Sequence, residues 1–337
     1  PLFDKLASSL LGLEGAPHVR LRKLVAKAFT PRATARLQDT IHEVVNGLID
    51  RVMDDGRCDV VTDIARPYPT PIICALLGAP ASDWQLFTGW TADITQAFGV
   101  SVAEHADSIV RAWTQLSDYV EHLIADRRQS LGDDLISELI RSEDDGDRLS
   151  HDELANLTAL LLIAGTDTTR NQLAAAVEVL AAHSEQWELL ARRPDLAPQA
   201  VEELMRHTPI VLGALRIATT DVALGGMIFP AGTAVIANSA AANRDPQVFP
   251  DPDRLDITRE GAPPMQSFGG GMHYCLGAHL ARVELTEALR VITARLTDVR
   301  IAGPAPWKPL AGISGPLALP IEFTARTSAN LGFPRAT

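Results

Sequence analysis

One long helical pattern, from Ser150 to about Ala182, constrains the fold of this chain more than any other feature. Ser150-His-Asp-Glu153 has the spacing of a capping box, so a helix is expected to begin there. Side chains at helical spacing then share one face: Leu154, Leu157, Leu161, Ala164 and Thr168. A helix of about 34 residues runs roughly 50 Å, which is long enough to cross the whole molecule. The rest of the chain must therefore pack around it.

The middle of this helix carries the segment Ala164-Gly-Thr-Asp-Thr-Thr169, which is polar and β-branched and therefore a poor choice for helix stability. One interpretation is a local kink, in which threonine hydroxyls donate hydrogen bonds to carbonyl oxygens four residues earlier. The other is that the distortion serves a function. The pattern by itself leaves both open.

A second unusual stretch runs from Phe268 to Arg282. Cys275 follows a glycine run and precedes both Gly277 and an apolar helical stripe formed by Ala281, Leu285, Leu289, Ile292 and Leu296. A sulfur just before a helix lies at the positive end of the helix dipole, which favours thiolate over thiol. Gly277 removes a side chain where a flat ligand would press on the turn. The stretch therefore predicts a cysteine whose position is fixed by the turn and whose sulfur is a reactive thiolate.

Three other interpretations of Cys275 compete with that one. A lone cysteine is most often a small buried hydrophobic residue. Zinc would need further ligands, and Cys58 and Cys74 lack the Cys-x-x-Cys spacing. A phosphate-binding loop would need a third glycine and a preceding strand pattern, which Gly269 and Gly271 do not have.

Composition limits the class of protein. The chain has 337 residues, 46% of them hydrophobic, which suffices for a large core and one or two domains. The densest apolar run, Leu157 to Ala164, is far shorter than the ~20 residues of a membrane span, and the start at Pro1 does not resemble a signal peptide. Three cysteines without framework spacing suit a reducing cytoplasm. A net charge of -12 argues against a nucleic-acid partner.

The remaining pattern is mainly helical up to about residue 207 and then mixed. Asp195 is expected to cap a helix that ends at Thr208-Pro209, and Cys58 to Arg66 is expected to be a loop. Short β-branched runs broken by glycine and proline predict strands between Ile210 and Ile236, and strand-like ends lie between Val299 and Phe323. Further helices are expected at His18–Ala28, Gln38–Met53, Ile72–Leu77, Trp84–Phe98 and about Ile109–Leu123.

The string Phe268-Gly-Gly-Gly-Met-His-Tyr-Cys-Leu-Gly277 resembles the haem-binding signature of the cytochrome P-450 family, Phe-x-x-Gly-x-His-x-Cys-x-Gly. Ala164–Thr169 is similar to the family's oxygen-activation motif. His18 and Arg22 match a propionate-binding pair, and Glu203 and Arg206, with Arg254 in Pro252-Asp-Arg254, match a buried structural triad. Without the resemblance, the first pair would be a solvated basic face and Glu203–Arg206 a surface ion pair worth about 0.5 kcal/mol.

The resemblance covers Pro17 to about Phe323 and implies a mainly α fold with a smaller β portion. It predicts a single domain over residues 1–337, with 17–207 mostly helical and 210–337 mixed. In this fold a long central helix lies over the haem, and the cysteine loop lies beneath it. Family members usually carry a segment ahead of the His18 helix that this sequence lacks, so the substrate pocket is expected to miss a wall and a sheet to have exposed edges.

The resemblance also implies the site residues. Cys275 ligates the iron of haem b, Thr168 steadies bound dioxygen, and Asp167 supplies protons. His18 and Arg22 hold one propionate, and Arg216 with His273 holds the other. The full set implied to contact the haem is His18, Arg22, Ala164, Gly165, Arg216, Phe268, Gly271, His273, Cys275 and Gly277.

The implied function is a haem-thiolate monooxygenase that inserts one atom of dioxygen into an unactivated C–H bond of a lipophilic small molecule. The resemblance implies that Leu160–Ala164, Ile210–Ala214 and the turn near Ile313 line the substrate pocket. These segments are almost all aliphatic, so a lipophilic substrate is expected. No reductase signature is present, so electrons are expected from a ferredoxin and ultimately from NAD(P)H. A haem-binding sensor and a peroxide-driven peroxygenase are the alternatives. A basic docking patch, or else a plain solvated face, is expected at Arg20, Lys23, Lys27 and Arg282.

Overall fold

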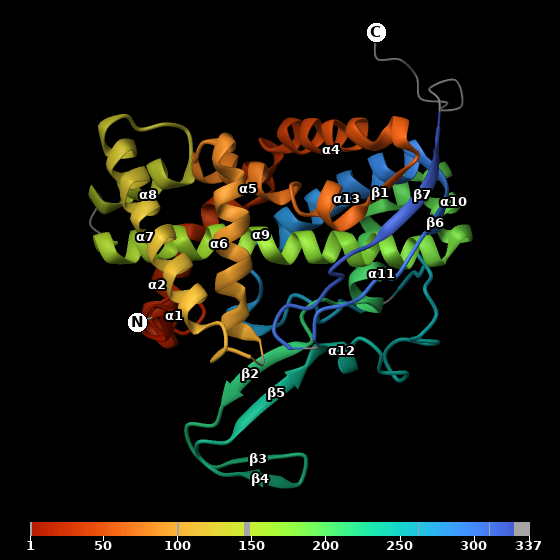
Figure 1. The fold of residues 1–337 in the computed structure, drawn as a ribbon. Helices are drawn as coiled ribbons and strands as arrows, with labels where there is room; N and C mark the ends of the chain where they lie inside the picture. The colour runs from red at the N-terminus through yellow and green to blue at the C-terminus, as the bar shows by residue number, and fades with distance from the viewer. Residues whose placement is uncertain (1, 100, 145–148, 262, 310, 327–337) are drawn as a thin grey trace.

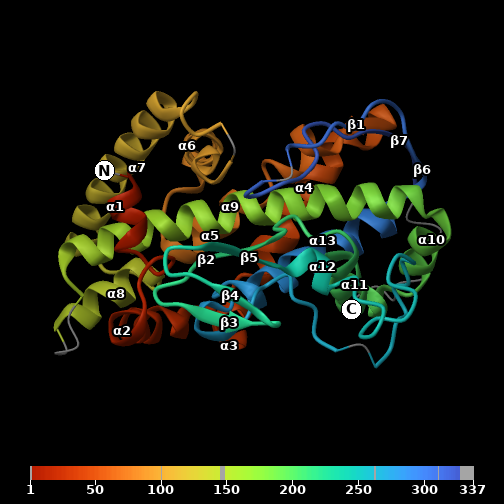
Figure 2. The same cartoon turned by 90° about the horizontal axis from the view of Figure 1, so that it is seen from below.

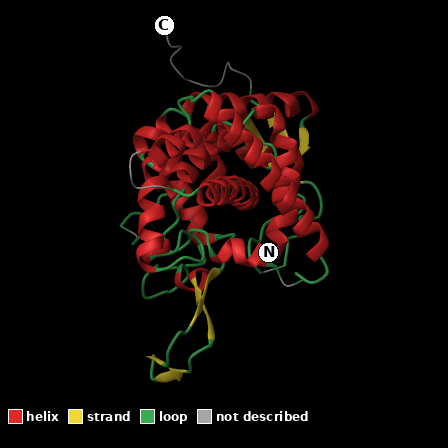
Figure 3. Ribbon diagram, turned by 90° about the vertical axis from the view of Figure 1, so that its left-hand side faces the viewer, coloured by secondary structure: helices red, strands yellow, loops and turns green. Residues whose placement is uncertain are grey.

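The computed structural model describes residues 2–99, 101–144, 149–261, 263–309 and 311–326. The long helix α9 (His151–Ala182) runs through the middle of the molecule (Figure 1). Figure 3 shows α9 end-on, with other elements around it on all sides. Its neighbours include α5, α6, α7, α10, α11 and α13. The described α-helices are α1 (Leu2–Ala7), α2 (Gly15–Ala26), α3 (Pro31–Ala35), α4 (Gln38–Val52), α5 (Pro69–Leu77), α6 (Trp84–Ile94), α7 (Ala106–Gln129), α8 (Leu135–Asp144), α9, α10 (Ser184–Arg192), α11 (Ala197–His207), α12 (Ser239–Ala242) and α13 (Ala278–Arg295).

The start and end of α9 confirm the sequence prediction. The Ser150 hydroxyl accepts a hydrogen bond from the Glu153 N–H at 3.2 Å, and the Glu153 carboxylate accepts one from the Ser150 N–H at 2.8 Å. Two N–H groups that lack intrahelical partners are thereby satisfied. Buried side chains occur on all faces of α9, as expected for a helix in the centre of a large core.

The predicted mainly helical fold with a smaller β portion is confirmed. The described strands form a three-stranded sheet in the order β1–β7–β6 and two separate antiparallel pairs, β2–β5 and β3–β4. In β2–β5, Leu215 lies opposite Ile236. The strand bounds are β1 (Arg57–Asp59), β2 (Gly213–Ile217), β3 (Val222–Leu224), β4 (Met227–Phe229), β5 (Ala234–Asn238), β6 (Leu296–Ile301) and β7 (Pro320–Ala325).

The strands β2 to β5 form an arm that projects from the helical body (Figures 1 and 3). Because β2 and β5 pair with each other in a sheet of two, each has an outer edge without a strand beside it among the described residues. Exposed apolar side chains lie along the arm: Leu215, Ile217, Val222, Leu224, Met227, Ile228 and Ile236.

Two local predictions are wrong. Cys58 to Arg66 is not a loop, because residues 57–59 pair with β7 and Val60–Ala65 forms a π-helix whose first N–H groups bond to the Asp59 carboxylate. Asp195 does not cap α11, because it lies inside the short 3₁₀ turn Pro194–Leu196, where its carboxylate pairs with Arg193 instead. The helices α1, α8 and α10 were not predicted from the sequence.

Candidate active site

The Phe268–Cys275 loop is closed by its own backbone. The Cys275 N–H donates to the Phe268 carbonyl oxygen at 2.9 Å, and the Tyr274 N–H donates to the Gly271 carbonyl oxygen at 3.1 Å. Gly269 and Gly271 have φ angles of +72° and +68°, which other residues rarely adopt. The glycine run therefore allows the tight turn that fixes the backbone on both sides of the cysteine.

Cys275 is an exposed residue and lies just before α13, which begins at Ala278. Figure 2 shows α13 beside the long helix α9. Desolvation by the surrounding protein raises the pKa of Cys275, although the Gly277 N–H and the charges of Arg22 and Arg282 lower it. The N–H group of Gly277 favours the thiolate, as predicted for the start of a helix, but desolvation outweighs it and the net pKa is raised. A cation bound to the sulfur would supply the missing stabilisation of the thiolate.

Beside this loop lies a buried histidine that has no hydrogen-bond partner at either ring nitrogen. His18 is 1% exposed, and its ring centroid lies 4.5 Å from that of His273. Burial, and then the charges of His273 and Arg22, lower the pKa of His18. Buried polar groups normally find a partner, so these nitrogens indicate that an acceptor bound here would complete the site.

Two further groups surround the histidine pair. Arg22 donates from Nη2 to the Tyr274 carbonyl oxygen at 2.6 Å, and His273 Nε2 lies 3.0 Å from the Glu14 carboxylate. These contacts bring α2 against the cysteine loop. Three of the predicted propionate ligands, His18, Arg22 and His273, thus lie together.

Arg216 lies on β2, and its contact with a propionate stays a prediction. It is exposed on β2, and its Nη1 donates to the carbonyl oxygen of its neighbour Leu215 at 2.8 Å. Among the described contacts, none joins Arg216 to His273. The reason is its place on the projecting arm rather than in the helical body (Figure 1).

On α9, the central motif has an open side and a packed side. Ala164 is exposed although most of its neighbours are buried, and the Thr168 hydroxyl donates to the Ala164 carbonyl oxygen at 2.7 Å. This is the back-bonding that one interpretation of the motif predicted. Gly165 packs against α5, since a Cβ atom there would lie 2.8 Å from the Ile73 side chain. Its hydrogen side chain is therefore needed for close packing of the two helices.

Asp167 is fully buried and is held by two cations. It forms an ion pair with Arg170 on the same helix and lies 3.7 Å from Lys308 Nζ. Sequence reasoning missed both partners. The i,i+3 spacing of Asp167 and Arg170 was a usable signal, because such residues are neighbours on a helix surface. No sequence signal pointed to Lys308, because it is distant from Asp167 in the chain.

The buried cluster around Glu203 has a different third member from the one predicted. Arg206 pairs with Glu203 at 2.7 and 2.9 Å, and Arg259 Nε lies 3.2 Å from both carboxylate oxygens. Arg254 contributes its main-chain carbonyl oxygen to Arg206 and Arg259, whereas its side chain is 67% exposed beside Asp256. The prediction for the Arg254 side chain is therefore wrong, because the turn directs it to solvent.

Phe268 and Gly277 complete the predicted set. The Phe268 ring is buried, with the Arg282 guanidinium 4.5 Å from its centroid. A Cβ atom on Gly277 or Gly271 would meet no atom within 4 Å, so there is open space beside the cysteine loop. The exposed residues Cys275 and Ala164 and the unpartnered nitrogens of His18 are consistent with a flat, anionic, metal-containing group. The residues present therefore fit a haem.

Comparison with known proteins places the chain in a family. The family model for cytochrome P-450 matches residues 4–192 and 178–295. This chain belongs to the cytochrome P-450 family, whose members bind haem, and it is a monooxygenase of that family.

The similar proteins are bacterial enzymes. Nocardicin C N-oxygenase of Nocardia uniformis subsp. tsuyamanensis is 40% identical over 323 residues, which cover 94% of this chain and 80% of that protein. Luteothin monooxygenase of Streptomyces thioluteus is 40% identical, over 96% of this chain and 80% of the relative.

Solved structures agree with this assignment. The crystal structure of CalO2 matches with a TM-score of 0.90 and 35% identity, over 96% of this chain and 82% of that one. The structure of a myxobacterial cytochrome P-450 in complex with myristic acid matches with a TM-score of 0.88 and 37% identity, over 94% and 79%. None of the helices described here is long and apolar enough to cross a membrane.

Proposed function

We propose that this monooxygenase holds haem b on the Cys275 sulfur and hydroxylates an unactivated C–H bond of a lipophilic small molecule. The observation that carries the proposal is the exposed Cys275 on a loop whose His273 lies against the buried, unpartnered His18. His18, Arg22 and His273 would bind the propionates, because they supply donors and positive charge at one place. The bound haem would supply the activation of dioxygen and the oxidation of the substrate.

Two residues of α9, Thr168 and Asp167, would take part in proton transfer. The Thr168 hydroxyl, now bonded to the Ala164 carbonyl oxygen, can turn to donate toward the open side of the helix. Asp167 lies next to it in sequence and is buried among its cations. To transfer a proton, its carboxylate must first release Arg170 or Lys308. A general acid is effective when it can reach the group that it protonates.

The expected substrate is lipophilic because two of the segments expected to line its pocket are aliphatic and contact each other. Val211 pairs with Ile313 in an isolated β-bridge, and the Ser314 N–H donates to the Ile210 carbonyl oxygen at 2.8 Å. These contacts bring two of the three predicted pocket segments together. The myristic acid in one similar structure is consistent with a lipophilic ligand.

A ferredoxin is proposed as the electron donor, with NAD(P)H as the ultimate source. Lys23 and Lys27 are exposed on and just after α2, whereas two members of the expected basic patch pair with acids: Arg20 with Glu153, and Arg282 with Glu202. The patch is therefore narrower than expected. Replacing Lys23 and Lys27 by Glu should slow reduction by a ferredoxin at low salt and have little effect at high salt. An unchanged rate at low salt would exclude this surface.

The cell compartment is proposed to be the cytoplasm. All three cysteines, Cys58, Cys74 and Cys275, are free thiols in the structure. Free thiols persist in a reducing compartment.

The ligand assignment is tested by Cys275→Ser. The reduced carbon monoxide complex of the wild-type protein should show the spectrum of a thiolate-ligated haem, and the variant should not. Cys58→Ser is the matched control and should keep that spectrum. A thiolate-type spectrum in the Cys275→Ser protein would disprove the assignment.

Turnover separates the enzyme from its alternatives. With a ferredoxin system, Thr168→Ala should consume NAD(P)H with less product per electron pair, because proton delivery is impaired. A ligand-binding sensor would show no turnover, and a peroxygenase would be driven by peroxide and be indifferent to this substitution. Unchanged coupling would exclude the role given to Thr168.

A further inference from the structure

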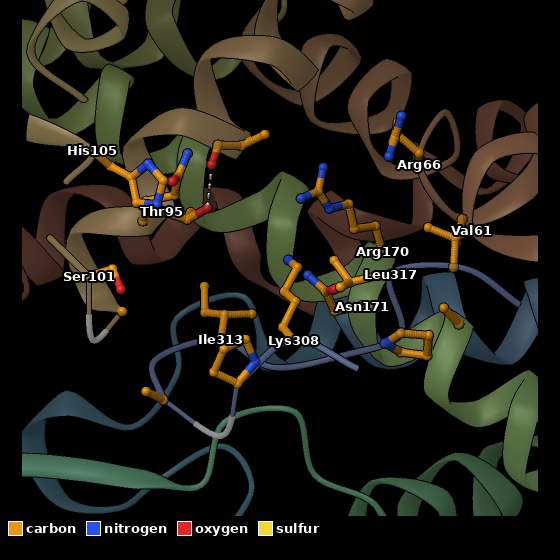
Figure 4. A pocket seen from close by; sticks show the side chains of 18 residues that line it. Val61, Arg66, Thr95, Ser101, His105, Arg170, Asn171, Lys308, Ile313 and Leu317 are labelled. Atoms are coloured by element: carbon orange, nitrogen blue, oxygen red, sulfur yellow. Dashed lines mark hydrogen bonds between the residues drawn. The ribbon is translucent and has the colours of Figure 1, made fainter. Parts of the chain in front are cut away.

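Positively charged side chains lie at two separate places beside the site. Arg170 and Lys308 face a cavity beside α9, near the centre of Figure 4, and both pair with Asp167. Arg282 lies on α13 instead, and its guanidinium packs against the cysteine loop. None of the residues that line the cavity belongs to that loop. Arg282 therefore acts on a different part of the site.

The Arg282 side chain is fixed by contacts with the loop and with α11. Its guanidinium carbon lies 4.5 Å from the centroid of the buried Phe268 ring, within the range in which a cation is attracted to the face of an aromatic ring. Its Nη1 donates to the Tyr274 hydroxyl oxygen at 3.2 Å, and its Nη2 donates to the Glu202 carboxylate at 3.1 Å. The charge of Arg282 is therefore held at one place against the loop.

The two loop residues that Arg282 contacts lie on either side of the cysteine backbone. The Cys275 N–H donates to the Phe268 carbonyl oxygen at 2.9 Å, and Tyr274 directly precedes Cys275 in the chain. Desolvation raises the pKa of Cys275, and the charges of Arg22 and Arg282 act against that rise. Arg22 is already one of the predicted propionate ligands, whereas Arg282 is not.

The ion pair of Arg282 with Glu202 is oriented with its positive member at the loop. Arg282 contacts Phe268 and Tyr274 directly, whereas none of the described hydrogen bonds and ion pairs joins Glu202 to the cysteine loop. Reduction of ferric haem adds one electron to the haem and its cysteine ligand. A positive charge fixed beside that ligand favours the reduced form, and a carboxylate next to the charge weakens the effect.

We propose that Arg282 raises the reduction potential of the bound haem, and that Glu202 limits how much of this charge acts on the cysteine loop. Arg282 is thus a positioning residue that acts through the loop. Its role rests on the proposed function, because it requires haem on the Cys275 sulfur. A reduced ferredoxin would give one electron to ferric haem, which leaves oxidised ferredoxin and ferrous haem. A higher haem potential makes this transfer more favourable.

A spectroelectrochemical titration of the haem-loaded protein, with dithionite and redox mediators and without substrate, measures the potential. Arg282→Gln should shift the equilibrium about tenfold towards ferric haem, which is a potential about 59 mV lower for one electron. Arg282→Lys keeps the charge and should keep most of the wild-type potential. Arg290→Gln is the matched control, because Arg290 is also an arginine of α13 paired with an acid, Glu287, and this variant should leave the potential unchanged.

Glu202→Gln tests the charge in the opposite direction. It removes the acid while it keeps Arg282, so the potential should rise above that of the wild type. A general loosening of the loop cannot raise the potential in one variant and lower it in the other. Glu202→Gln also decides the question if Arg282→Gln retains no haem.

The carbon monoxide spectrum separates this role from the proposed function. A wild-type protein without the thiolate-type spectrum would overturn the proposed function and the role of Arg282 together. With that spectrum present, the role of Arg282 alone is wrong if Arg282→Gln and Arg290→Gln have equal potentials, or if Glu202→Gln fails to raise the potential.

Discussion

Exchanging Arg259 for Gln should destabilise the protein far more than exchanging Arg254 for Gln. Arg259 donates from Nε to Glu203 at 3.2 Å, from Nη1 to the Pro250 carbonyl oxygen at 2.6 Å, and from Nη2 to the Asp251 and Arg254 carbonyl oxygens at 3.2 and 3.0 Å. Its side chain is 13% exposed. The Arg254 side chain has one partner at 3.4 Å and is mostly in solvent.

The magnitudes follow from burial. Removing one partner of a buried ion pair costs about 3–5 kcal/mol, and the lower end applies to Arg259→Gln because Arg206 still pairs with Glu203. An exposed ion pair contributes about 0–1 kcal/mol. Arg254→Gln should lose no more stability than this, because the variant keeps the main-chain carbonyl oxygen that accepts from Arg206 and Arg259. For a chain of 337 residues, about 3 kcal/mol corresponds to a fall in Tm of roughly 4 °C.

Thermal unfolding followed by circular dichroism, at one scan rate for all variants, measures the difference. The haem-loaded wild-type protein sets the reference Tm. Arg259→Gln should melt roughly 4 °C lower, and Arg254→Gln should melt close to the wild type. Equal falls in Tm for the two variants, or a larger fall for Arg254→Gln, would refute the reasoning and restore Arg254 as the third member of the cluster.

Three further predictions concern helix packing, capping and pH. Gly165→Ala should lower the free energy of unfolding in urea by about 1–3 kcal/mol, because the new Cβ atom would lie 2.8 Å from the Ile73 side chain. Gly277→Ala is the comparison: its Cβ atom would meet no atom within 4 Å, so the variant protein should be as stable as the wild type but retain haem less well. Ser150→Ala should cost about 1 kcal/mol through loss of the capping box of α9, and no change in unfolding would contradict that role. Burial and then the charge of Arg244 lower the pKa of His207, so His207 binds a proton more readily in the unfolded protein than in the folded one. The free energy of unfolding should therefore fall as pH drops below about 6.5. The His207→Gln variant should lose less stability than the wild type between pH 7.5 and 5.5, and an equal loss would count against this role of His207.

The sequence predicted the elements whose signals are local. The capping box and the apolar spacing of α9 predicted both ends of the helix, because helix formation depends on residues within a few positions of one another. The glycines at 269 and 271 predicted a special turn before Cys275, and both adopt left-handed angles. The resemblance of a short motif then predicted the family, which the comparisons confirmed.

Other expectations failed because a neighbour distant in sequence decides the outcome. The segment from Cys58 lacks a local strand signal, and its pairing with β7 depends on residues 320–322. The failure at Asp195 is local instead, because its carboxylate pairs with Arg193, two positions earlier in the chain. Propensity and spacing are weak priors that tertiary contacts override.

By itself, the sequence determined that a long helix crosses the molecule and that a cysteine precedes another helix, because both depend on short-range backbone geometry. The tertiary structure decided which charges meet. It brought Arg259 rather than the Arg254 side chain to Glu203, and Lys308 to Asp167 across a distance of 141 positions in the chain. The physical reason is that the free energy of a buried charge depends on groups that surround it in space, and the order of residues does not state which groups those are.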